Sequence, residues 1–200
     1  MMEPLVTAIF LLLLSGTTMS KEPNNLGHSQ CDSLAYRDMA LIYSGAEHDL
    51  FTNKAFFNNE LVYKYDSESQ TAKPQPGWEN VENWGEISKL QKERGDFALE
   101  NVELIKKTFG YRDDYNLTGI YGCDVCKNNV IKVRWTYYDS DKPLITFDTN
   151  GPAWKALSRE GKILKKKWEE DPSAPNRAKS YLEEDCPKKL QEYKNYKNTN

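Results

Sequence analysis

The spacing of two cysteines constrains the fold of this chain more than any other feature. Cys123 lies in a strand-like run, residues 120–125, and Cys186 lies in a helix-like run, residues 181–186, with 62 residues between them. A disulfide between these cysteines would hold the later helix against the earlier strand. Closing a loop of that length stabilises the folded chain by about 4 kcal/mol in the chain-entropy model. This geometry is typical of a binding platform rather than of a catalytic centre.

The four cysteines imply two disulfides, for which three connectivities exist. Cys123 and Cys126 resemble a redox or zinc C-x-x-C motif. Residues three positions apart on a strand point to opposite faces, so we expect these two not to pair with each other. We expect the pairs Cys123–Cys186 and Cys31–Cys126, and the second of these would attach the N-terminal segment to the edge of the sheet.

The N-terminal residues 1–20 predict a secretory signal peptide. An apolar core, residues 5–14, is followed by small and polar residues. The alternative is a membrane anchor, but about 20 apolar residues are needed to cross a bilayer and this run is much shorter. The C-terminal residues 192–200 are polar. We therefore expect a secreted, extracellular protein with no membrane anchor.

Charge and motif content exclude several classes of function. A formal net charge of −3 argues against a nucleic-acid partner. The basic run at residues 162–167 is flanked by acidic side chains and indicates a solvated helix face. The sequence contains no G-x-S-x-G motif, no phosphate-binding glycine loop and no second C-x-x-C, and its only histidines are His28 and His48. We expect no enzymatic activity, no cofactor and no metal site.

The chain repeats one plan, strands followed by a long helix, in residues 33–112 and again in residues 113–200, after an N-terminal extension at 21–32. Runs of β-prone residues predict strands, and apolar residues near helical spacing predict helices. In the first half we expect strands at 39–43 and 61–65, a turn-rich stretch at 66–77, and a helix from Trp78 to about Phe109. In the second half we expect strands at 117–125, 131–137 and 144–147, and helical sequence at 156–196.

Prolines divide the second helical region. Pro172, Pro175 and Pro187 each remove a backbone donor and favour kinks or breaks. Strands followed by a helix, twice, predict an α+β protein with helices on one face of an antiparallel sheet. Two such halves side by side would give one continuous sheet roofed by two helices, with a groove between the helices.

Asn116-Leu117-Thr118 is the only glycosylation sequon. It follows a polar stretch, residues 112–116, that predicts a turn just before a strand. We therefore expect Asn116 to be exposed and glycosylated.

Several short stretches, taken in order and with the cysteine spacing, resemble the platform of major histocompatibility class I molecules, and within that family its zinc-alpha-2-glycoprotein branch. The resemblance runs from about residue 38 to residue 197 and implies a single antiparallel sheet of about eight strands roofed by two long helices. The matching stretches are Tyr43-Ser44-Gly45, Leu90-Gln91-Lys92, Tyr121-Gly122-Cys123, Pro152-Ala153-Trp154, Lys167-Trp168-Glu169 and residues 177–187.

Departures from the family pattern argue against peptide presentation. Class I molecules hold peptide ends with tyrosines, a lysine and a tryptophan of both helices. The second helix has the matches Lys167, Trp168, Tyr181 and Tyr193, but residues 106–109 of the first helix lack the clamping tyrosine. The chain also ends where such proteins continue into an immunoglobulin-like third domain, so we expect no light-chain partner.

The resemblance implies a groove that holds a small hydrophobic or lipid-like molecule, such as a fatty acid. Arg94 matches an arginine that reaches into the groove in the zinc-alpha-2-glycoprotein branch, where a guanidinium could orient a carboxylate head group. The other matched groove positions are Phe97, Asn101, Tyr121 and Trp168, with Trp135 as a floor residue. Arg94 could instead be a solvated charge, and Phe97 and Trp168 could be core packing. Tyr121 and Trp154 suit structural roles, with residues 152–154 as the cap of a short helix.

A second function fits the same platform. The chain could be a soluble ligand or decoy for an immune receptor of the activating natural-killer-cell type, with a closed groove. The spacing of the two long helices separates the hypotheses, because a carrier needs a gap wide enough for an acyl chain.

Overall fold

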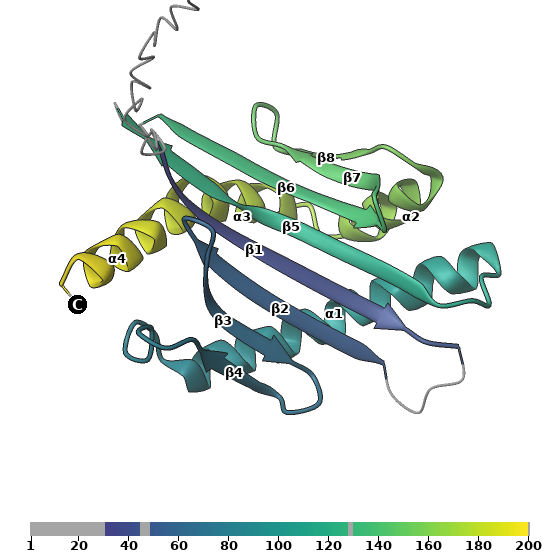
Figure 1. The fold of residues 1–200 in the computed structure, drawn as a ribbon. Coiled ribbons are helices and arrows are strands. Elements are labelled where there is room, and N and C mark those ends of the chain that lie inside the picture. The colour runs from purple at the N-terminus through teal and green to yellow at the C-terminus, as the bar shows by residue number, and fades with distance from the viewer. Residues whose placement is uncertain (1–30, 45–48, 128–129, 200) are drawn as a thin grey trace, which may run out of the picture.

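One antiparallel sheet carries all the helices on a single face (Figure 1). The computed structural model describes residues 31–44, 49–127 and 130–199. The predicted signal peptide at 1–20, most of the predicted extension at 21–32, and both histidines lie outside the described residues.

The sheet has eight strands in the order β4-β3-β2-β1-β5-β6-β7-β8. The first strand of each half lies at the centre, where β1 and β5 pair along their whole length, from Cys31 opposite Cys126 to Ile42 opposite Tyr115. The two halves therefore form one continuous sheet, as predicted. The strands are β1 (Cys31–Ile42), β2 (Leu50–Phe57), β3 (Glu60–Asp66), β4 (Thr71–Pro74), β5 (Tyr115–Cys126), β6 (Ile131–Asp139), β7 (Lys142–Asp148) and β8 (Ala153–Ala156).

The first half ends in one long helix, α1 (Trp84–Phe109). The side chain of Asn83 caps its start by accepting from the backbone N–H of Glu86, and Gly110 ends it with a φ of 69°, a conformation that favours glycine. The prediction that this helix starts at Trp78 is wrong. Trp78 is fully buried, and its indole Nε1 donates to Glu60 on β3 at 3.0 Å. A large apolar side chain just before a helix produces the same sequence signal as one within it.

The second half is helical in pieces, as the prolines predict. The segments are α2 (Arg159–Trp168), α3 (Ala174–Ser180), a π-helical turn (Tyr181–Asp185) and α4 (Cys186–Thr199). Pro172 lies in the break between α2 and α3, and Pro175 lies in the first turn of α3. Pro187 is the second residue of α4, which follows the π-helical turn. This turn brings Tyr181 and the buried Leu182 onto the side of the helix that faces the sheet.

Several strands escaped prediction because their buried positions are not all apolar. β2 buries Phe51, Asn53, Ala55 and Phe57. Because Asn53 is polar and Ala55 is small, the alternation of apolar and polar residues that predicts a strand is obscured. β1 buries the charged residue Asp38 near its middle, so the predicted strand began only at Met39. Residues 152–154, predicted as a helix cap, instead lead into the edge strand β8, although Trp154 is buried against the sheet.

Both disulfides have the predicted pairing. Cys123 of β5 is joined to Cys186, the first residue of α4, and both are almost fully buried. The second bridge does not attach to the sheet edge, because Cys31 and Cys126 are register partners on the two central strands.

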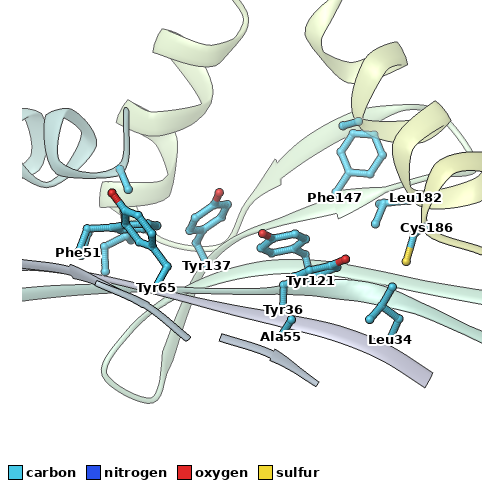
Figure 2. Close-up of a cluster of buried hydrophobic side chains, with 14 of the residues drawn as sticks. Leu34, Tyr36, Phe51, Ala55, Tyr65, Tyr121, Tyr137, Phe147, Leu182 and Cys186 are labelled. Atoms are coloured by element: carbon cyan, nitrogen blue, oxygen red, sulfur yellow. The ribbon is translucent and has the colours of Figure 1, made fainter. Parts of the chain in front are cut away.

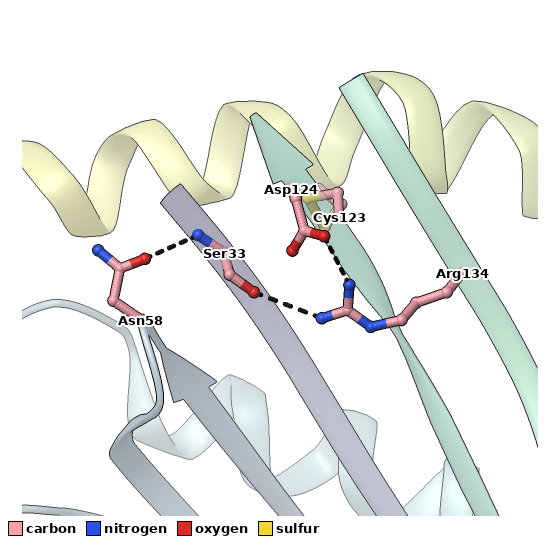
Figure 3. The surroundings of a disulfide bond; sticks show 6 residues. Ser33, Asn58, Cys123, Asp124 and Arg134 are labelled. Carbon is pink, nitrogen blue, oxygen red and sulfur yellow. Dashed lines mark hydrogen bonds and ion pairs between the residues drawn. A yellow bond between two sulfur atoms is a disulfide. The ribbon is translucent and has the colours of Figure 1, made fainter. Parts of the chain in front are cut away.

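Polar contacts fasten the central strands beside the disulfide of Cys123 (Figure 3). The carboxylate of Asp124 accepts from Arg134 Nη1 of β6 at 2.9 Å. Arg134 Nη2 also donates to the hydroxyl of Ser33 on β1 at 3.3 Å, and the Ser33 backbone N–H donates to Asn58. These bonds link β1, β5 and β6 next to the point where α4 is anchored.

The core fills the space between the sheet and the helices. Figure 2 shows Leu34 and Tyr36 of β1 and Tyr121 of β5 rising from the sheet, with Leu182 and Cys186 on the helical layer above. Aromatic residues make up much of this layer, and aromatic pairs contribute about 0.5–1.5 kcal/mol beyond the area they bury. The floor beneath the helices is thus mainly aromatic.

The start of α2 is tied to the end of α1 through a buried carboxylate. Glu160 accepts from the hydroxyl of Tyr111, just after α1, at 2.7 Å and from Arg159 Nε at 2.9 Å. Burial alone would raise the pKa of Glu160, but these hydrogen bonds outweigh it and lower the pKa to about 2. The ionised form of Glu160 therefore stabilises the packing of α2 against α1.

We expect Glu160→Gln to lower the stability at neutral pH and to lose this effect in acid. Because the folded-state pKa of about 2 lies below the ordinary value of 4.5, the stabilisation is complete above about pH 4.5 and disappears as the pH falls toward 2. Urea unfolding midpoints of the variant and the parent at pH 7, 4 and 2.5 test this. The control is Glu169→Gln, which removes an exposed carboxylate next to α2. An equal deficit for Glu160→Gln at all three pH values would contradict the assignment.

Candidate functional site

Two adjoining cavities lie between α1 and the helices of the second half. Their volumes are about 610 and 530 Å³, within the range of about 300–1,000 Å³ that small-molecule sites usually have. They share four lining residues, which mark the junction between them: Arg94, Phe97, Trp135 and Tyr181.

The larger cavity is walled by aromatic rings from the sheet and α2. Trp154 and Trp168 meet edge to face with ring centres 4.6 Å apart, and Tyr137 lies 5.2 Å from Trp168. The charged residues on its lining are Asp38, Arg94, Lys167, Glu170, Asp171 and Arg177. Such a wall offers apolar area to a ligand, with charges mainly contributed by the helices at its rim.

The smaller cavity is lined by tyrosines: Tyr36, Tyr63, Tyr121, Tyr181 and Tyr193. The rings of Tyr36 and Tyr121 stack with centres 5.1 Å apart. Burial raises the pKa of Tyr181 to about 12, and it raises the pKa values of Tyr36 and Tyr121 well above their ordinary range. These hydroxyls therefore remain protonated and uncharged at neutral pH.

An ion pair occupies the floor at the junction of the cavities. Arg94 Nε of α1 lies 2.6 Å from Asp38 Oδ2 of β1, and the other oxygen of Asp38 accepts from Asn53 Nδ2 at 2.6 Å. The guanidinium lies over the ring of Tyr121, with its carbon 4.1 Å from the ring centre, and 5.4 Å from that of Trp135. Arg94 thus reaches into the groove, as the resemblance implies, but it meets a carboxylate of the protein itself.

Burial has opposite effects on the two members of this pair. It raises the pKa of Asp38 above its ordinary value, against the lowering effect of the Arg94 charge. Burial alone would lower the pKa of Arg94, but Asp38 outweighs this and the pKa is raised. Arginine remains protonated in proteins, so Arg94 stays charged and Asp38 is its counter-charge.

The helices contact each other at the end of the groove near α2. Trp168 Nε1 donates to Asn101 Oδ1 of α1 at 3.2 Å, a buried bond, and Lys167 Nζ lies 3.3 Å from Glu100 Oε2. Phe97 of α1 packs near Trp168, with ring centres 6.3 Å apart. This end of the groove is therefore bounded by contacts between the two walls.

The opposite end is bounded by Glu82, which precedes α1. Its carboxylate accepts from the hydroxyl of Tyr193 at 2.9 Å and lies 3.0 Å from Lys189 Nζ, both on α4. Of the four matches to peptide-clamp positions, Lys167, Trp168 and Tyr193 are thus bonded to the first half of the protein itself.

Most of the predicted groove residues lie on the cavities. Arg94, Phe97 and Trp135 line both, Trp168 lines the larger cavity and Tyr121 the smaller. Asn101 lines neither; it is buried and orients the indole of Trp168.

Sequence reasoning missed Asp38 and Tyr137 on the lining of the larger cavity. It gave Trp154 a structural role only and named Tyr181 only as a match to a peptide-clamp position, although both line this cavity. The sequence around Asp38 could have predicted its burial. Tyr36 and Ala40, two positions before and after it, are apolar residues that would lie on the same face of a strand. A charged side chain between them on the same face must be paired if that face is buried.

The sequon does not lie in a turn, contrary to the prediction. Asn116 is the second residue of β5 and is half-buried, on the face of the sheet opposite the helices. The hydroxyl of Thr118 lies 3.4 Å from its Oδ1.

The described residues offer neither a membrane span nor a metal site among their helices and side chains. None of the helices described is long and apolar enough to span a membrane. In the same part of the chain, no cluster of His, Cys, Asp and Glu side chains is arranged to hold a metal ion.

Comparisons with known proteins agree with this architecture. A family model described as Class I Histocompatibility antigen, domains alpha 1 and 2, matches residues 30–200. Zinc-alpha-2-glycoprotein from Homo sapiens is 32% identical over 198 residues, which cover 93% of this chain and 62% of the relative. IgG receptor FcRn large subunit p51 from Camelus dromedarius is 26% identical, with 94% of this chain and 51% of the relative covered.

A more distant similarity is to the Class I histocompatibility antigen, F10 alpha chain, from Gallus gallus. It is 24% identical, with 82% of this chain and 49% of the relative covered. The chain therefore spans between about half and two thirds of the length of these relatives.

Proposed function

Because the chain belongs to the class I histocompatibility antigen family, whose alpha 1 and alpha 2 domains it matches, we propose that it binds a small hydrophobic or lipid-like molecule between its helices. We propose also that it does not present peptides. The observation that carries this proposal is the pair of adjoining aromatic cavities, about 610 and 530 Å³, in a groove whose two walls contact each other at both ends.

The bounded ends of the groove favour a small ligand over an extended peptide. Groups that could hold peptide termini, Lys167, Trp168 and Tyr193, are bonded to α1 or to the segment before it. A peptide would have to break these bonds, and breaking the buried one between Trp168 and Asn101 would leave polar atoms unpaired at a cost of about 1–3 kcal/mol each. A short apolar chain can enter between the bounded ends without breaking them.

The ligand can be identified from protein purified without denaturation. We expect solvent extraction followed by mass spectrometry to release an amphiphile from secreted protein. Binding to the emptied protein can then be followed with Nile red, an uncharged dye whose emission rises in apolar sites.

Filling the larger cavity is expected to weaken binding at least tenfold. Ala174 is half-buried on the lining of this cavity, so Ala174→Phe would place a ring in the space for the ligand. The matched control is Asn176→Phe, which adds the same ring two residues away on α3 at an exposed position that lines neither cavity. Nile red titration of the two variants gives the comparison. Equal affinities would place the ligand elsewhere.

A second candidate function is a soluble ligand or decoy for an immune receptor. The observation that favours it is the direct bonding of the first half to the helices of the second half, between Asn101 and Trp168 and between Glu82 and Tyr193. These bonds give the outer helical surface a fixed shape before any partner binds. Binding to a panel of natural-killer-cell receptors separates the two functions. Tight receptor binding by protein with the cavities empty favours this candidate, whereas a carrier needs no such contact.

Three further features belong to the same proposal. Residues 1–20 would act as a signal peptide and direct the protein to the extracellular space. Asn116 would carry a glycan on the open face of the sheet. The two platform halves would be residues 33–112 and 113–200, each contributing one wall of the groove. No catalytic role is proposed for any residue of the site.

A further inference from the structure

The charge of Arg94 is already balanced inside the protein. Its Nε lies 2.6 Å from Asp38 Oδ2, and Asp38 is only 2% exposed. Asp38 itself lines the larger cavity, next to Arg94. A ligand at the junction of the two cavities therefore meets a cation and an anion side by side, with no net positive charge to attract it.

The guanidinium also lacks the free edge that a carboxylate requires. An arginine holds a carboxylate by two parallel bonds, either from Nε and Nη2 or from Nη1 and Nη2. In Arg94, Nε is bonded to Asp38, and Nη2 is buried and makes no hydrogen bond of normal geometry. One flat side of the guanidinium is covered by the ring of Tyr121. Both two-bond arrangements are thus closed to a ligand.

Besides Arg94, the smaller cavity has one basic residue on its lining, Lys189, and this lies 3.0 Å from Glu82, which balances its charge. The polar groups around the guanidinium also include tyrosines of the same lining. The hydroxyls of Tyr36, Tyr121 and Tyr181 are protonated at neutral pH, and a hydroxyl can both donate and accept a hydrogen bond. They match an alcohol or amide head group, which also donates and accepts. An ionised carboxylate in the same place would lose its hydration without gaining a counter-charge.

We propose that this groove selects amphiphiles with an uncharged polar head group, such as an alcohol or amide, over fatty-acid anions. The inference rests on the proposed function, because it specifies the head group of the ligand proposed there. It replaces the expectation that Arg94 orients a carboxylate. The apolar tail would occupy the larger, tryptophan-lined cavity, and the head group would face the tyrosines of the smaller one.

The test compares two ligands that differ only in the head group, dodecanol and dodecanoate, at pH 8, where the acid is ionised. Each displaces Nile red from the emptied protein at concentrations below micelle formation. We expect dodecanol to bind the parent protein at least tenfold more tightly than dodecanoate. In Asp38→Asn, the charge of Arg94 is no longer balanced. We expect the ratio of the affinity for dodecanol to that for dodecanoate to fall at least tenfold in this variant. The double variant Asp38→Asn with Arg94→Met is neutral again and should prefer the alcohol.

The control is Asp96→Asn, which removes an equal charge from an exposed position on α1 close to Arg94 and should leave the ratio unchanged. Equal binding of dodecanol and dodecanoate by the parent protein would overturn the inference even if Asp38→Asn failed to fold. A ratio that stayed the same in folded Asp38→Asn would also overturn it. If neither Nile red nor either ligand binds any of these proteins, the proposed function fails together with the inference.

Discussion

Replacing both Cys123 and Cys186 with alanine is expected to lower the free energy of unfolding by about 4 kcal/mol. The bridge closes a loop of 63 positions between β5 and the start of α4. Without it, the unfolded chain gains conformational freedom while the folded chain loses the disulfide that holds α4 on the sheet. Guanidinium unfolding of the oxidised proteins, followed by tryptophan fluorescence, gives the difference. Ligand affinity should fall as well, because α4 forms part of the wall of the smaller cavity.

The second disulfide provides the control. Removing Cys31 and Cys126 opens a longer loop of 95 positions and is expected to cost a similar amount of stability. These residues lie at the ends of two central strands that also pair along their whole length, so the groove should keep its shape and its affinity for Nile red. If both double variants lost ligand binding equally, the bridge from Cys123 to Cys186 would have no particular role in forming the groove.

Replacing Asp38 with asparagine is expected to cost about 3 kcal/mol of stability. The substitution keeps the shape of the side chain but leaves the Arg94 charge without its partner, and breaking a buried ion pair in this way costs about 3–5 kcal/mol. The lower end of this energy range applies because the Arg94 side chain is still 22% exposed to solvent. Urea unfolding at pH 7 measures the loss.

A double-mutant cycle separates the ion pair from simple packing. Arg94→Met removes the charge, and adding it to Asp38→Asn should recover most of the lost stability, because no unpaired charge then remains. If the losses of the two single variants simply added in the double variant, the pair would not be coupled, and the neutral character assigned to the groove floor would be lost.

The overall architecture was predictable because its main signals are local or covalent. The alternation in β6, the long apolar stripe of α1 and the two disulfides each point to the same platform. The failures occur where a buried position holds a polar or small residue. Asn53 and Asp38 lie on the buried face of β2 and β1, and each concealed part of its strand.

The candidate site was only partly predictable for the same reason. Arg94, Phe97 and Trp135 could be placed on the groove from the family resemblance, but the partner of Arg94 could not. Asp38 and Arg94 lie on different elements, and only the pairing of β1 under α1 brings them together. Asn101, placed in the groove by the resemblance, is turned beneath Trp168 by the packing of α1 against α2.

The ion pair on the groove floor also has an evolutionary consequence. Its members lie 56 positions apart in the sequence, yet a change in either one alone leaves a lone charge inside the protein. Lineages descended from this chain should therefore retain both residues or replace both, so the two positions should covary. The preference for one head group over another would then depend on both residues together. A lineage that changed them one at a time would pass through a less stable intermediate.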